Sequence, residues 1–141
     1  MLNIENLTTQ TINYKLLETI SNSLTTKEID ITICDNKTIQ KYNSEYRGVN
    51  KATDVLSFPI ISKFESMPLG SIIISIDKVI EKSDELGHTR DEELALLFIH
   101  GVLHLLGFDH EVDSGEMRER ERELINKFNL PKSLIIRTES L

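Results

Sequence analysis

Apolar positions alternate with polar ones, or recur at helical spacing, along most of the chain. Isoleucine occupies every second position of residues 28–34, which predicts a strand with one buried face. Leucine and isoleucine recur three or four positions apart over residues 14–24, which predicts an amphipathic helix. Further strands are predicted at residues 2–7, 54–60 and 69–76.

Polar residues and glycines mark where the predicted elements begin and end. Asp35 can cap a helix that runs to about Tyr46, and residues 47–53 are predicted to form a loop. Asp77 is the expected N-cap of the next helix, which ends near Gly87. Pro59, near the end of a predicted strand, indicates the edge of a sheet or the end of that strand.

The segment ELALLFIHGVLHLL is the most apolar part of the chain. Thr89 and Glu92 precede it with the spacing of a capping box. A helix that is apolar on nearly all sides is normally buried, and Gly107 can end it in a left-handed turn. We therefore expect this helix at the centre of the protein.

A last helix is expected to begin at Asp113 or Ser114 and to end before Pro131. Its tract of mixed charges at 116–125 is interpreted as a solvated face. Strands and helices in this order predict an α+β fold. The length of 141 residues suits one domain over residues 1–141.

Composition narrows the class of protein. Cys34 is the single cysteine, so no intrachain disulfide can form; it alternates with the isoleucine face of its strand and is expected to be packed. We find neither a signal peptide nor an apolar run long enough to span a membrane, and therefore expect a cytoplasmic protein. The formal net charge of -7 counts against broad nucleic-acid binding, but a local basic cluster remains compatible with it.

Residues 100–110, HGVLHLLGFDH, contain three of the four histidines. His100 and His104 are four residues apart on the predicted helix, so both rings lie on one face. Gly107 can turn the chain back and bring His110 within reach as a third ligand. Three protein ligands and one open position are typical of catalytic zinc. The motif predicts one divalent ion per chain, with zinc as the expected metal, on a buried helix and the following turn.

Metzincin proteases share this histidine spacing, with a glutamate after the first histidine as general base. Gly101 stands at that position here and has no side chain to take a proton. The fourth histidine, His88, is expected in an exposed loop. Asp109 is expected either to orient a histidine or to cap a turn.

HGVLHLLGFDH resembles the signature of the YbeY family of metal-dependent endoribonucleases. The segments YRGVNKATDVLSFP at 46–59 and LGSIIIS at 69–75 also resemble that family, and the resemblance covers roughly residues 28–127. It implies an α+β fold in which a small mixed β-sheet is packed with helices, a metal site made by the three histidines of the motif, and action on ribosomal RNA in the cytoplasm. Ser71 stands where the family usually carries an acidic residue, so no role is assigned to that side chain.

The segment before the strand at 54–60 carries residues suited to RNA. The functionally important arginine of the family falls on Arg47, whose planar guanidinium suits a phosphate. Without the resemblance, a solvated arginine would be the better interpretation. Lys51 lies nearby, Thr53 and Ser57 are expected to line a cleft, and Asp54 is expected to fix the start of the strand.

The leading hypothesis is a hydrolase that cuts single-stranded RNA. The resemblance implies work in maturation of the 3′ end of small-subunit ribosomal RNA and in ribosome quality control, with the ribosome as partner and no membrane. Hydrolysis by water and attack by a ribose 2′-hydroxyl are both compatible with the sequence. Two alternatives stay open: a zinc peptidase, and a non-catalytic ribosome-associated factor whose metal stabilises its fold.

Overall fold

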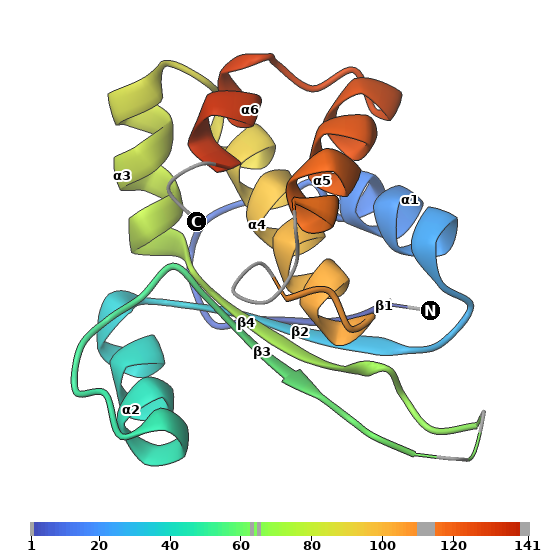
Figure 1. Ribbon diagram of the computed structural model, residues 1–141. Helices are drawn as coiled ribbons and strands as arrows, with labels where there is room; N and C mark the ends of the chain where they lie inside the picture. Colours follow the sequence, from blue (N-terminus) through green and yellow to red (C-terminus); the bar gives the residue numbers. More distant parts are fainter. Residues whose placement is uncertain (1, 63, 65, 110–114, 139–141) are drawn as a thin grey trace.

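A four-stranded mixed sheet carries one helix on one face and five on the other (Figure 1). The structure is a computed structural model and describes residues 2–62, 64, 66–109 and 115–138. The strands are β1 (Leu2–Asn6), β2 (Ile29–Cys34), β3 (Val55–Pro59) and β4 (Gly70–Ser75). The helices are α1 (Tyr14–Leu24), α2 (Asn36–Arg47), α3 (Ile76–Leu86), α4 (Arg90–Leu105), α5 (Glu116–Lys127) and α6 (Ser133–Thr138). The predicted α+β class is confirmed.

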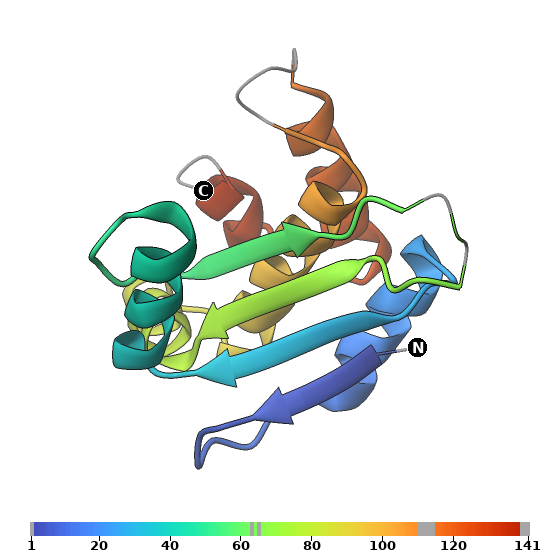
Figure 2. The same cartoon turned by 90° about the horizontal axis from the view of Figure 1, so that it is seen from below.

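The strand order is β1-β2-β4-β3 (Figure 2). The pairs β1–β2 and β2–β4 are parallel, whereas β3 runs antiparallel to β4, with Ser57 opposite Ile72. β3 is therefore an edge strand, and it ends at Pro59, as the proline predicts. Among the described strands, β3 pairs only with β4, so a cleft can form along its other edge.

Side chains from the sheet enter two separate apolar clusters because neighbouring residues of a strand point to opposite faces. The larger cluster includes Ile31 and Ile72 and joins the sheet to α1, α3, α4 and α5. The smaller cluster lies on the α2 face and consists of Cys34, Ile39, Leu56 and Ile73. Tyr46 at the end of α2 also contacts Phe58 edge-on, at 5.5 Å between ring centroids. These contacts fix the C-terminal end of α2 beside β3.

Helix α4 lies at the centre of the five-helix face (Figure 1). The capping box predicted for Thr89 and Glu92 is present, with both reciprocal hydrogen bonds. Every residue from Leu94 to Leu103 is buried, which explains why the segment shows no polar face. Gly107 follows with φ +101°, the left-handed conformation expected of it.

Three details differ from the sequence prediction, and a fourth, the predicted start of the last charged helix, lies outside the described residues. Arg47 is the last residue of α2 and not part of the following loop. Ser75, not Asp77, caps α3; Asp77 lies in the first turn and accepts a hydrogen bond from the Asn36 backbone N–H at 2.8 Å. Helix α5 begins at Glu116 in the described part of the chain, and the proposed starts at 113 and 114 lie outside it. Helix α6, beyond the proline, was not predicted.

Within the described residues, no helix is both long enough and apolar enough to cross a membrane.

Candidate metal centre and substrate cleft

Two histidine side chains on α4 converge on one point. The Nε2 atoms of His100 and His104 lie 3.0 Å apart. The other nitrogen of each ring is held by a separate partner: Nδ1 of His100 lies 3.0 Å from Glu121 Oε1, and Nδ1 of His104 lies 3.0 Å from the Phe108 carbonyl oxygen. Helical spacing on α4 brings the rings together, and the contacts at Nδ1 orient them.

The hydrogen-bond chemistry of this pair fits a bound cation. A carbonyl oxygen can only accept, so Nδ1 of His104 carries a hydrogen and its Nε2 presents a lone pair. Nδ1 of His100 donates in the same way to the Glu121 carboxylate. Two lone pairs at 3.0 Å repel each other unless they share a proton or a metal ion, and neutral ring nitrogens are favoured ligands of zinc.

Two of the three predicted ligands, His100 and His104, lie in the described part of the chain. His110 lies outside the described residues. Among the residues that the structure does describe, no group of three or more His, Cys, Asp or Glu side chains is placed to hold an ion. The described part of the site is therefore the His100–His104 pair with its two supporting acceptors.

Glu121 is a site residue that the sequence prediction missed. The tract 116–125 was expected to be a solvated face, but Glu121 on α5 is buried and contacts His100. Its second oxygen, Oε2, is buried with no hydrogen-bond partner among the described residues. Glu121 lies on the apolar stripe of α5, which its buried neighbours Met117, Leu124 and Ile125 define. A glutamate at helical spacing within such a stripe is the signal that could have revealed it.

The histidine pair opens into a cleft of about 550 Å3 between α4, α2 and the edge strand β3. Arg47, at the end of α2, lines the same cleft and is exposed. Ser57 of β3 also lines it, and its hydroxyl donates a long hydrogen bond of 3.4 Å to the Gly101 carbonyl oxygen. Asp54 and Asp109 add carboxylates to the wall. Segments far apart in sequence thus place a guanidinium and two imidazoles around one volume.

Two of the predicted substrate-binding residues are not among those that line this cleft. Lys51 is exposed beyond α2, and its backbone carbonyl accepts a hydrogen bond from Asn43. Thr53 is half-buried, with its hydroxyl 3.5 Å from Asp54 Oδ1. Ser71 follows the alternation of β4 and shares the α2 face with Ile73, away from the histidines.

Gly101 lies where α4 crosses β4. A Cβ atom there would come within 3.0 Å of two side-chain carbons of Ile72, closer than real contacts usually allow. The position that carries the glutamate base in metzincins is therefore pressed against the sheet. Glycine at this position thus lacks a proton acceptor and also fits the close packing of α4 on β4.

His88 differs from its prediction as an exposed loop histidine. Its side chain is almost fully buried, with Nε2 at 2.8 Å from Glu93 Oε1 and Nδ1 at 3.4 Å from the Ser133 hydroxyl. The burial arises because α6, which the prediction lacked, covers this position. His88 belongs to a polar network outside the histidine pair of α4.

The fold and the site together define an α+β protein with a histidine-lined cleft, and comparison with known proteins agrees. The profile of the family described as "Endoribonuclease YbeY" matches residues 2–129. A protein of that name from Sulfurimonas denitrificans is 53% identical over 139 residues, which cover 99% of each chain. Another of that name, from Campylobacter jejuni strain RM1221, is 57% identical over 122 residues, covering 86% of this chain and 90% of the relative.

Among solved structures, the solution structure of TM1509 from Thermotoga maritima superposes with a TM-score of 0.63 at 27% identity. The match covers 91% of this chain and 89% of that one. The chain belongs to the endoribonuclease YbeY family.

Proposed function

We propose that this protein is a metal-dependent endoribonuclease that cuts single-stranded RNA. The observation that carries the proposal is the pair of Nε2 atoms 3.0 Å apart in a cleft that Arg47 also lines. The names of the family and of its near-full-length relatives support RNA as the substrate. In the cell, the expected work is maturation of the 3′ end of small-subunit ribosomal RNA and ribosome quality control, in the cytoplasm.

The proposed metal ligands are His100, His104 and His110, with zinc as the expected ion. A divalent ion held there would supply Lewis-acid activation of water and of a phosphoryl oxygen. Glu121 and the Phe108 carbonyl keep the rings in the tautomer that presents Nε2 to the cleft. This support prepares the site before substrate arrives.

Arg47 is proposed to bind the scissile phosphate and to stabilise the charge that develops on it. Its place at the C-terminal end of α2 leaves the guanidinium exposed to the cleft, where phosphate can reach it. Ser57 of β3 is proposed to contact the RNA. Lys51 and Thr53 are proposed to bind the part of the RNA that extends beyond the cleft. With a net charge of -7, capture of RNA depends on this local set of donors.

The peptidase alternative loses support because Gly101 has no proton acceptor, and a side chain added there would press tightly against Ile72. Purified protein should cleave a single-stranded RNA oligonucleotide and leave casein intact, and removal of metal with a chelator should abolish cleavage. The second alternative is a non-catalytic ribosome-associated factor whose metal stabilises its fold, and His104→Ala tests it. A folded but inactive variant supports catalysis by the metal site. Chelator-sensitive hydrolysis of casein, without cleavage of RNA, would contradict the proposal.

A further inference from the structure

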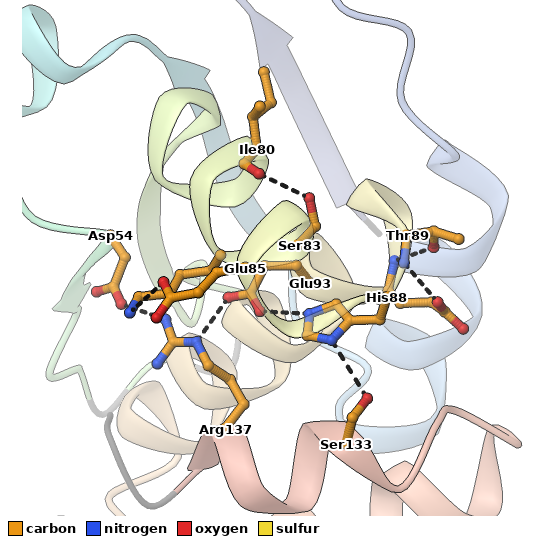
Figure 3. A network of polar contacts seen from close by, with 11 residues as sticks. Asp54, Ile80, Ser83, Glu85, His88, Thr89, Glu93, Ser133 and Arg137 are labelled. Carbon is orange, nitrogen blue, oxygen red and sulfur yellow. Dashed lines mark hydrogen bonds and ion pairs between the residues drawn. The ribbon is translucent and has the colours of Figure 1, made fainter.

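Helix α6 brings a buried arginine against Asp54, a residue that lines the cleft (Figure 3). Arg137 Nη2 lies 2.8 Å from Asp54 Oδ2, and Arg137 Nε lies 3.1 Å from Glu93 Oε2. The arginine side chain is 2% exposed, so the two contacts are made away from bulk water. One guanidinium therefore joins the start of β3 to the first turns of α4.

The Glu93 end of this network is deeply buried. The Glu93 side chain is 0% exposed, and its second oxygen contacts His88, whose ring in turn contacts Ser133 of α6. Figure 3 shows Asp54, Glu93 and His88 in a row, with Arg137 and Ser133 reaching them from α6. A buried carboxylate requires such compensation because an unpaired charge is costly to remove from water.

The Asp54 end faces the cleft. Its side chain is 27% exposed and lines the same volume as Arg47 and His100. Its Oδ1 accepts a hydrogen bond from the Val55 backbone N–H at 2.9 Å, while Oδ2 faces Arg137. A bare carboxylate at this place would repel a phosphate, since like charges in a partly enclosed cleft are poorly screened.

We propose that Arg137 is a positioning residue for the substrate, which holds and neutralises the Asp54 carboxylate so that an RNA phosphate can enter the cleft beside it. This inference rests on the proposed function. Arg137 lies beyond residues 2–129, the part of the chain that the family profile matches, so the profile assigns it no part in the site. The C-terminal helix thereby becomes part of the substrate-binding wall.

Two roles of Arg137 make different predictions: a purely structural role, in which it only holds β3 against α4, and a role in which it neutralises the charge of Asp54. If Arg137 only fastens β3 to α4, removal of the Asp54 charge cannot repair its loss. If Arg137 acts by neutralising Asp54, then Asp54→Asn removes the repulsion and makes Arg137 dispensable for binding. A double-mutant cycle on these two residues separates the two roles.

The test uses the full chain and a fluorescent, uncleavable 2′-O-methyl RNA oligonucleotide, with binding followed by anisotropy. Arg137→Met should raise Kd about tenfold through the uncovered negative charge. Asp54→Asn should bind at least as tightly as wild type, and the double variant should return to within about twofold of Asp54→Asn. Arg122→Met, which removes one positive charge from an exposed position of α5, is the control and should leave Kd unchanged within about twofold.

If Arg137→Met fails to fold, Glu93→Gln/Arg137→Met replaces it, since that pair leaves no buried carboxylate uncompensated on α4. A double variant that binds as weakly as Arg137→Met would overturn the inference, as would a wild-type protein that binds no oligonucleotide. Cleavage of unmodified RNA is measured separately. A wild type that binds but never cleaves would refute the proposed function, while the binding series still decides the part played by Arg137.

Discussion

Arg47 ends α2, and its exposed side chain lines the cleft that contains the two histidines of α4. A cationic residue at a helix C-terminus also interacts favourably with the helix dipole, so its position has a structural explanation as well as a functional one. The structural and the functional explanation differ in which Arg47 variants should lose activity. Only the functional one requires the planar guanidinium.

Arg47→Ala should keep the fold and the bound metal and slow single-turnover cleavage of RNA. A charged donor that stabilises transition-state charge is worth about 2.7–4 kcal/mol in comparable sites, so the rate should fall roughly 10²–10³-fold. Arg47→Lys should restore little, because lysine keeps the charge but not the planar fork of donors. Arg118→Ala, at an exposed position of α5, is the control. Cleavage by Arg47→Ala at the wild-type rate would remove Arg47 from the mechanism.

Cys34 illustrates a residue whose chemistry is suppressed by packing. Burial, with smaller contributions from the carboxylates of Asp35 and Asp77, raises the pKa of the Cys34 thiol to about 11. The reactive thiolate is therefore scarce near neutral pH, and its population rises only as the pH approaches that value. Native protein at pH 8 should resist iodoacetamide, and unfolded protein should be alkylated completely, as mass spectrometry would show. Rapid alkylation of the native protein would contradict the packing described for β2.

At the scale of elements, both α4 and α5 contribute residues to the proposed metal site. Helix α4 presents the two rings, and α5 supplies the buried carboxylate of Glu121 that orients one of them. The Oε2 atom of Glu121, which has no hydrogen-bond partner in the described part of the chain, is costly to bury, and a cation on the histidines would offset part of that cost. The two helices should therefore be coupled through the ion.

Glu121→Gln should weaken metal binding about tenfold, since supporting residues of this kind are worth 10–100-fold in metal affinity and glutamine keeps an acceptor oxygen but loses the charge. Competition with a chromophoric zinc chelator measures the change. Glu123→Gln on the exposed face of the same helix is the matched control. If both variants bind zinc equally well, Glu121 has no part in supporting His100.

Local patterns predicted the elements well and their long-range contacts poorly. The limits of α1, and the capping box of α4, follow from residues a few positions apart, and both are confirmed. The choice between Ser75 and Asp77 as N-cap depends on where β4 ends, which tertiary pairing decides. Helix α6, one short segment after Pro131, carries too little periodicity to be recognised alone.

The site residues show the same contrast between local patterns, which the sequence predicts well, and long-range contacts, which it predicts poorly. His100 and His104 were identified because helical spacing alone brings them together. Glu121 lies 21 residues from His100, and Arg137 lies 83 residues from Asp54, so each contacts its cleft-lining partner only through packing of α5 and α6. His88 looked exposed because nothing in its local sequence indicates the helix that covers it.

At the scale of the whole molecule, the cleft forms where three distant segments meet at the free edge of β3. Helix α2 brings Arg47 from one face of the sheet, and α4 brings the histidines from the other. The antiparallel pairing of β3 with β4 sets Ser57 between them. In a protein with a net charge of -7, the groups proposed to bind phosphate thus lie at one edge of the sheet.

The central claim, that the histidines of α4 hold a divalent ion, is tested most directly by elemental analysis of the purified protein. Wild type, saturated with zinc and then dialysed, should retain about one divalent ion per chain. His104→Ala, with its fold verified by circular dichroism, should retain far less, because one of the two converging Nε2 atoms is lost. A wild-type protein that retains no metal, or a His104→Ala variant that retains as much as wild type, would contradict the account.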